Sequence, residues 1–204
     1  MRTGNTSITT LELRDIIKKE ILSRKNHEDK GQHKRPLLVA IDGRSASGKT
    51  TLAGELAEEF DASVIHMDDF FLPVELRTPE RFAMPGGNVH FERFQEEIMT
   101  PFEEGRLESY RRFDCKVLDF EEKKKQVKQG DVLFVEGAYS TLPRFGRYYD
   151  FSVFMDITYE EQIKRIEKRN GPEKCKQFVD RWIPLEEAYI NAYQVKEQAD
   201  YYIR

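Results

Sequence analysis

Eight residues from Gly43 to Thr50, GRSASGKT, have the types and spacing that bind phosphate. They match the pattern G-x-x-x-x-G-K-[ST] at every fixed position. Glycines let the backbone wrap so that successive N–H groups point at an anion, and a following helix adds the partial positive charge of its N-terminus. Lys49 can then reach the β- and γ-phosphates of a nucleotide, and the Thr50 hydroxyl can bind Mg²⁺.

The motif therefore predicts a nucleoside triphosphate site, with ATP or another NTP and Mg²⁺ as cofactors. The alternative is a chance match on a serine-rich turn, but an apolar strand pattern precedes the loop and a helix pattern follows it, which is the expected setting. The predicted nucleotide-binding residues are Gly43, Ser45, Ala46, Ser47, Gly48, Lys49, Thr50 and Thr51.

Carboxylates follow two other apolar segments. The segment ASVIHM leads into Asp68 and Asp69, and the segment VLFVE ends in Glu136. Ligands of open parallel sheets bind at the carboxyl ends of the strands. Asp68 could therefore orient an acceptor hydroxyl and take its proton during phosphoryl transfer, and Glu136 could hold Mg²⁺ or its water shell. The alternative for the Asp pair is a helix cap or a turn.

The elements that must position these side chains alternate along the chain. Strands are predicted at 36–41, 62–67, 132–136, 151–157 and 200–204, and helices after the glycine-rich loop, at 91–104, at 160–169 and from 185 to about 198. Strands that alternate with helices indicate βαβ units and a parallel sheet. The predicted fold class is α/β: a three-layer P-loop NTPase fold with a mostly parallel central sheet and helices on both faces.

The N-terminal segment has its own helix signal. Thr9 and Glu12 form a capping-box pattern, and an amphipathic stripe follows it at Leu13, Ile16, Ile17 and Ile21. A polar link, NHEDKGQHKR, joins this helix to the first strand. We expect residues 1–35 to form this helix and link, and residues 36–204 to form the P-loop domain.

Bulk composition narrows the class of protein. A chain of 204 residues suits a single domain with its own core, and a net charge of −4 argues against a general nucleic-acid binder. The start of the chain lacks the apolar region of a signal peptide, and no membrane span is evident, so a cytoplasmic location is expected. Cys115 and Cys175 match no metal or redox spacing, which favours ordinary reduced thiols.

The motifs together resemble the uridine kinase and phosphoribulokinase-like group of P-loop kinases. The resemblance runs from about Pro36 to the C-terminus and rests on IDGRSASGKTTLA, HMDDFFLP, PGGNVHFERF with PFEEG, YRRFD, VLFVEGAY, and FMDIT followed by a basic helix. The first motif is shared by many P-loop enzymes. The strand-ending motifs MDDFF and VEGAY, in that order, are more specific.

The resemblance implies roles for particular residues. Asp68 would act as the base on the acceptor hydroxyl with Asp69 beside it, and Glu136 would lie near Mg²⁺. A lid at about 160–182 would bring Arg165 and Arg169 to the phosphates, and their spacing of four places them on one helix face. The catalytic set is thus Lys49, Asp68, Arg165 and Arg169. An ordinary solvated basic face is the alternative for the lid arginines.

The acceptor side is less well determined. The connection from Leu72 to Asn88 is long enough to be a binding loop, with Arg77 and Arg81 as contacts, or else a mobile surface insertion. His90 stands where the resembled family often has an aspartate for sugar hydroxyls, and Tyr110 and Arg112 stand where it has contacts to the base. The predicted substrate-binding residues are Asp68, Asp69, Arg77, Arg81, His90, Tyr110 and Arg112.

The preferred function is an ATP-dependent kinase that phosphorylates a hydroxyl of a small molecule, with the 5′-hydroxyl of uridine or a related nucleoside as the leading acceptor. A sugar, a sugar phosphate or a vitamin-like alcohol are the alternatives within this class. A nucleotide-binding regulator or simple NTP hydrolase is the alternative outside it. Asp68 at a strand end, followed by an arginine-bearing loop, favours the kinase. The resemblance also suggests a homo-oligomer.

Overall fold

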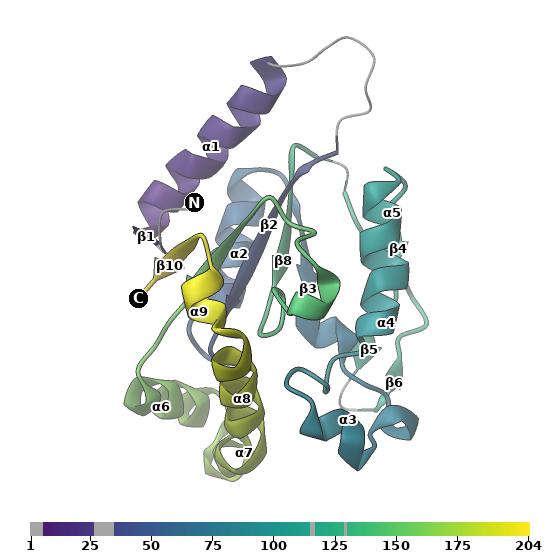
Figure 1. Cartoon of the computed structure of the whole chain (residues 1–204), viewed down its shortest axis with the longest axis vertical. Helices are drawn as coiled ribbons and strands as arrows, with labels where there is room; N and C mark the ends of the chain where they lie inside the picture. The colour runs from purple at the N-terminus through teal and green to yellow at the C-terminus, as the bar shows by residue number, and fades with distance from the viewer. Residues whose placement is uncertain (1–5, 27–34, 115–116, 129) are drawn as a thin grey trace.

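The computed structural model describes residues 6–26, 35–114, 117–128 and 130–204. Its centre is a six-stranded sheet of order β1-β10-β9-β2-β8-β3, in which every neighbouring pair is parallel (Figure 1). The strands are β1 (Thr6–Ser7), β2 (Leu37–Gly43), β3 (Ser63–His66), β8 (Val132–Glu136), β9 (Phe151–Met155) and β10 (Tyr201–Ile203). The five predicted strands and the three-layer α/β fold are confirmed, and β1 is an additional edge strand.

The sheet is buried on both faces, and most residues of its central strands are apolar. In β2, Leu37, Val39 and Ile41 face one side and Leu38 faces the other, as the two-residue period of a strand requires. The first face is covered by α1 (Thr10–Asn26) and α2 (Lys49–Glu59).

Two groups of helices cover the other face (Figure 1). One is a continuous helix made of α4 (Phe91–Phe94), a π-helical turn (Gln95–Met99) and α5 (Thr100–Glu103), at the position of the predicted helix 91–104. The other is α8 (Ile183–Tyr193) with α9 (Val195–Gln198).

The N-terminal helix packs directly against the central layers. Its capping box is confirmed, since the Thr9 N–H donates to the Glu12 carboxylate at 2.7 Å and the Glu12 N–H donates to the Thr9 hydroxyl at 3.2 Å. Leu13 and Ile17 are fully buried in the core under α2, and Arg14 bridges to α2. The helix is therefore part of one helical layer; most of the polar link lies outside the described residues, as does Cys115.

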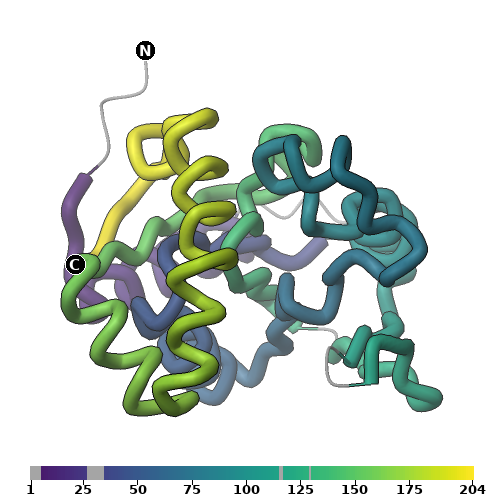
Figure 2. Tube along the Cα trace, turned by 90° about the horizontal axis from the view of Figure 1, so that it is seen from below, coloured from purple at the N-terminus to yellow at the C-terminus, as the bar shows by residue number. Residues whose placement is uncertain are grey.

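The predicted lid at 160–182 folds as α6 (Tyr159–Asn170), α7 (Pro172–Gln177) and a π-helical turn (Phe178–Trp182) that continues into α8. Its small core consists of Ile166 and Cys175 with Ile183 of α8, and Ala46 of the glycine-rich loop packs against it. This packing ties the lid to the phosphate-binding loop. Seen from below, the lid and α8 lie on one side of the sheet's carboxyl edge and residues 72–88 on the other (Figure 2).

Residues 72–88, here called the acceptor segment, are more ordered than the sequence suggested. They contain a 3₁₀ turn (Val74–Leu76) and α3 (Pro79–Ala83). The Thr78 hydroxyl accepts the Arg81 N–H at 3.2 Å, and proline occupies the first helical position, where its missing N–H has no consequence. Threonine followed by proline was thus a helix start inside the predicted loop.

Two short antiparallel ladders follow α5. Strand β4 (Ser109–Tyr110) pairs with β7 (Lys125–Gln126), and β5 (Phe113–Asp114) pairs with β6 (Asp119–Phe120). Two-residue strands carry too few residues for a periodic pattern, which is why sequence analysis did not find them. Within the described ranges, no helix is long and apolar enough to cross a membrane.

Candidate active site

The glycine-rich loop joins β2 to α2, and its glycines are required by geometry. Gly43 has φ +137°, and a Cβ placed on it would lie 2.1 Å from the carbonyl oxygen of Met155 in β9. Gly48 has φ +102° directly before the first turn of α2. The close approach and the positive φ angles exclude side chains at these positions, so the motif glycines shape the loop.

Lys49 and Ser47 are buried polar groups, of which the first makes no ion pair and the second no hydrogen bond among the described residues. Lys49 is 7% exposed, and its Nζ donates to the carbonyl oxygens of Gly43 at 2.9 Å and Arg44 at 2.7 Å. None of the ion pairs among the described residues includes Lys49, and the Ser47 hydroxyl is buried without a hydrogen-bond partner. A buried cation needs a counter-charge. These residues therefore fit the β- and γ-phosphates of a nucleotide.

Thr50 and Glu136 meet beside the loop. The Thr50 hydroxyl is 3.2 Å from both carboxylate oxygens of Glu136, which is 4% exposed. His66, the residue paired with Glu136 across β3 and β8, places Nδ1 2.5 Å from Oε1 of the same carboxylate and so orients it. One hydroxyl and one carboxylate fit Mg²⁺, which keeps several waters and also binds substrate phosphates.

A metal here would depend on such outside ligands. In the part of the chain that the structure describes, no group of three or more His, Cys, Asp or Glu side chains is arranged to hold a metal ion. The protein thus offers a partial Mg²⁺ site that nucleotide phosphates would complete.

Asp68 lies in a 3₁₀ turn (Met67–Phe70) that begins where β3 ends. Its side chain is exposed and lines a cavity. Desolvation by the surrounding protein raises the pKa of the Asp68 carboxyl, and the neighbouring charge of Glu136 raises it further, against the opposing effect of Lys49. A carboxyl with a raised pKa, beside a cavity, is suited to accept a proton from a hydroxyl.

A single cavity of about 340 Å³ joins these groups, a size typical of small-molecule sites. Eight of the residues predicted from the sequence line it: Ser45, Ala46, Lys49, Thr50, Asp68, Arg77, Glu136 and Arg169. Gly43, Ser47 and Gly48 shape the loop behind it, and Thr51 lies exposed in the first turn of α2. The roles assigned to these residues stay predictions.

The lid closes one side of the cavity. Arg169 lines it, whereas Arg165 pairs with Glu161 at 2.9 Å and donates from Nη1 to the carbonyl of Ala46 at 3.3 Å. Both predicted arginines therefore lie beside the loop. At the far end of the lid, the rings of Trp182 and Phe71 are 5.8 Å apart, so the lid contacts the residue directly before the acceptor segment.

Arg81 and His90 lie outside the cavity lining. The Arg81 guanidinium donates to both carboxylate oxygens of Glu92 at 2.8 Å and to the carbonyl of Gly87 at 3.0 Å, so it holds the acceptor segment in shape. His90 is half-buried, its Nδ1 has no partner, and burial lowers the pKa of its imidazole.

Asp69 and Tyr110 form a buried contact outside the cavity lining, and the exposed Arg112 joins it. The carboxylate of Asp69 accepts from the Tyr110 hydroxyl at 2.7 Å and from Arg112 Nε at 3.1 Å. Burial, with the Asp69 charge as a further cause, raises the pKa of the Tyr110 phenol. This contact attaches the 3₁₀ turn that carries Asp68 to the β4–β7 region, and none of the three residues lines the cavity, so their substrate-binding role stays a prediction.

Asp42 and Tyr139 were not among the residues predicted from the sequence. Asp42 is 1% exposed, and its carboxylate accepts from the backbone of Gly43 at 2.7 Å and of Tyr139 at 3.2 Å. Tyr139 lines the cavity with φ +77°, a conformation that a tyrosine rarely adopts. Such strain is found where surrounding contacts hold a residue for function. The positive φ had no sequence signal.

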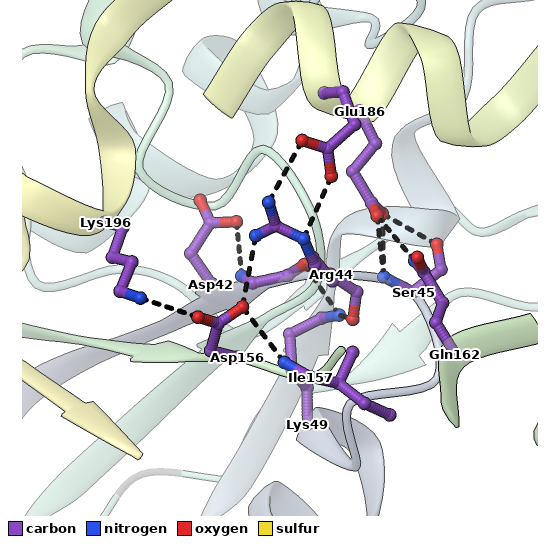
Figure 3. Close-up of polar contacts among 11 residues, drawn as sticks. Asp42, Arg44, Ser45, Lys49, Asp156, Ile157, Gln162, Glu186 and Lys196 are labelled. Carbon is purple, nitrogen blue, oxygen red and sulfur yellow. Dashed lines mark hydrogen bonds and ion pairs between the residues drawn. The ribbon is translucent and has the colours of Figure 1, made fainter. Parts of the chain in front are cut away.

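Glu186 of α8 is the other residue that was missed. It is 2% exposed, and its carboxylate accepts from the Ser45 backbone N–H at 2.8 Å, the Ser45 hydroxyl at 2.7 Å and Gln162 Nε2 at 3.1 Å (Figure 3). Burial raises its pKa, although Lys49 and these hydrogen bonds oppose the rise. Glu186 thus links α8, α6 and the phosphate-binding loop.

Comparisons with known proteins agree with this geometry. No protein-family model matches the chain. A curated uridine kinase of Clostridium botulinum (strain Kyoto / Type A2) is 27% identical over 146 residues, which cover 65% of this chain and 68% of that protein. A solved structure described as a possible uridine kinase from Bacillus stearothermophilus has a TM-score of 0.62 at 22% identity, covering 95% of this chain and all of that one.

The D-glycerate 3-kinase of Cryptococcus neoformans has a TM-score of 0.65 at 15% identity, covering 95% of this chain and 92% of that one. The fold is therefore that of the P-loop kinases. The resemblance to uridine kinase-like P-loop kinases is confirmed, by the curated relatives in sequence and by the solved structures in fold.

Proposed function

We propose that this protein is a kinase that transfers the γ-phosphoryl group of ATP, or of another NTP, to a hydroxyl of a small molecule. The observation that carries the proposal is the shared cavity of Lys49 and Asp68. Lys49 is a buried cation that makes no direct ion pair among the described residues, and Asp68 is a carboxyl with no hydrogen bond or ion pair among the described contacts and with a raised pKa. A cation for phosphate and a base for a hydroxyl are the two groups that phosphoryl transfer needs.

Each residue has a chemical task in this scheme. ATP would supply the phosphoryl group, and Mg²⁺ held with Thr50 and Glu136 would neutralise phosphate charge. Lys49 binds the phosphate oxygens. Asp68 accepts the proton of the attacking hydroxyl and aligns its oxygen. Arg169, in the cavity wall, stabilises the negative charge of the transferring group.

Two kinds of relatives support two different classes of acceptor. The curated uridine kinases support a nucleoside such as uridine, phosphorylated at its 5′-hydroxyl. The fold shared with a D-glycerate kinase supports a sugar, sugar phosphate or vitamin-like alcohol. A regulator or simple NTP hydrolase would need no space beyond the phosphates, whereas the cavity continues to Arg77 and Asn88 of the acceptor segment. Cytoplasmic location and self-association belong to the same proposal.

The test is ATP turnover with and without a panel of nucleosides, sugars and sugar acids. We expect ADP release to depend on one class of acceptor and a phosphorylated product to form. In Asp68→Asn, product formation should collapse while the Kd for an ATP analogue stays within about twofold. ADP release that is the same with every acceptor would overturn the kinase proposal, and equal loss of ATP binding would give Asp68 a structural role.

A further inference from the structure

The acceptor segment contains two arginines with opposite surroundings. Arg81 has its guanidinium engaged on three sides by Glu92, Gly87 and Val89. Arg77 uses only Nε, which donates to the carbonyl of Leu72 at 2.7 Å. No ion pair among the described residues includes Arg77, and its side chain lines the cavity. The two terminal nitrogens of Arg77 are therefore available to donate hydrogen bonds to a ligand in the cavity.

Asn88 gives an independent indication of a ligand at the same place. It is 3% exposed and lines the cavity, yet neither its amide nitrogen nor its amide oxygen has a hydrogen-bond partner. The Asn88 side chain acts on the Tyr139 phenol and opposes the rise in its pKa, but the contact is too poorly aligned to satisfy either amide atom. Buried side-chain amides are almost always satisfied. A cavity-facing amide with both atoms unsatisfied is a place where a ligand would bind.

Leu72 holds these two residues side by side. Its N–H donates to the carbonyl of Asn88 at 3.1 Å, and its own carbonyl accepts from Arg77. The neighbouring wall is aromatic, since Phe71 and Trp182 both line the cavity. Such a wall excludes water and strengthens any charge interaction inside.

We propose that the acceptor carries an anionic group, a carboxylate or a phosphate, which is bound by Arg77 while Asn88 binds a polar atom next to it. This inference rests on the proposed function and narrows it from any small hydroxyl compound to a sugar acid or sugar phosphate. With Nε engaged by Leu72, the planar guanidinium keeps one free edge, formed by its two terminal nitrogens, whose two N–H groups match the two oxygens of such a group. A neutral nucleoside would leave this cation without a counter-charge.

The experiment compares matched acceptor pairs that differ in one anionic group: glycerol with D-glycerate, and ribose with ribose 5-phosphate, with uridine as the neutral nucleoside. We expect kcat/KM of the preferred anionic member to exceed that of its neutral partner by about 10- to 100-fold, the size of a charge-assisted hydrogen-bonded pair. The glycerate pair reports a carboxylate and the ribose pair a phosphate.

Variants of the two arginines provide the control. Arg77→Gln should raise KM for the anionic acceptor by about 10- to 100-fold and leave the Kd for ATP unchanged. Arg77→Lys should recover part of the loss, because it keeps the charge but not the bidentate geometry. Arg81→Gln makes the same charge change in the same segment outside the cavity, so it should not discriminate between the two members of a pair.

The outcomes separate this inference from the proposed function. Two results would overturn the proposal of an anionic acceptor and leave the proposed kinase function intact. One is that uridine or another neutral compound is phosphorylated as well as the anionic compounds are. The other is that Arg77→Gln has the same effect on both members of a pair. If no acceptor of either charge is phosphorylated while ATP is hydrolysed, the proposed function fails and this inference fails with it.

Discussion

Asp42 offers the sharpest test of how the site is held together. Its Oδ1 accepts from the backbone of Gly43 and Tyr139, and its Oδ2 accepts from the Thr141 N–H at 2.8 Å, the Thr141 hydroxyl at 2.7 Å and the Tyr189 hydroxyl at 2.7 Å. One carboxylate thus joins the phosphate-binding loop, the turn after β8 and α8. We predict that Asp42→Asn destabilises the protein strongly although it changes almost no volume.

The magnitude follows from the donors. If the amide oxygen faces Gly43 and Tyr139, the amide NH₂ replaces Oδ2. The two hydroxyls can rotate to accept from it, but each loses charge assistance, worth about 1 kcal/mol. The Thr141 backbone N–H then faces another donor, which costs about 1–3 kcal/mol. The sum is about 3–5 kcal/mol, or a fall in Tm of roughly 6–20 °C for a chain of this size.

The assay is urea unfolding followed by circular dichroism, with Tyr189→Phe and Thr141→Val as matched controls. Each control removes one hydroxyl donor and leaves the Asp42 carboxylate with its other partners, so each should cost only about 1 kcal/mol. When Tyr189→Phe is added to the Asp42→Asn variant, it should lower the free energy of unfolding by less than it does in the wild-type protein, because the two residues share one hydrogen-bond network. An Asp42→Asn variant as stable as Tyr189→Phe would refute this reasoning.

Three further predictions concern the loop and its acids. Lys49→Met should abolish binding of an ATP analogue in calorimetry, because it removes the buried ammonium group that would bind the phosphate oxygens. Burial raises the pKa of Glu186, so the folded protein binds a proton at this carboxyl more tightly than the unfolded chain does. The wild-type protein should therefore gain stability relative to Glu186→Gln as the pH falls from 8 to 5, and the Tm of both proteins at each pH measures this. Acceptor phosphorylation should decline as the pH falls through the raised pKa of Asp68, and ATP binding should not follow this decline in a pH–rate series.

The sequence predicted the fold and the phosphate side of the site well because both rest on local patterns. The β2 strand, the glycine-rich loop and α2 are adjacent in the chain, and the loop geometry depends on two glycines that the motif contains. Asp68 and Glu136 were found because they end parallel strands, and the parallel order brings those ends to one edge.

The acceptor side was predicted less well because its contacts are not local. Arg77 and Arg81 are four residues apart in one segment and cannot be distinguished by type or spacing. What separates them is Glu92, which engages Arg81, and the Leu72 carbonyl, which turns Arg77 towards the cavity. Asp69 and Tyr110 are joined across 41 residues by a hydrogen bond that no local pattern encodes.

Glu186 did leave a signal in the sequence. It is a charged residue at a position that belongs to the buried, apolar face of its helix. In α8, Ile183, Glu186 and Ile190 are spaced three and four apart and are buried, whereas Glu187 is not. A carboxylate on that stripe must have a partner in the interior, because unpaired burial is costly. The partner of Glu186 is the Ser45 donor pair in the phosphate-binding loop. An acidic residue on the buried face of the helix that follows the lid, such as Glu186, therefore indicates a contact between that helix and the phosphate-binding loop, even where no motif marks it.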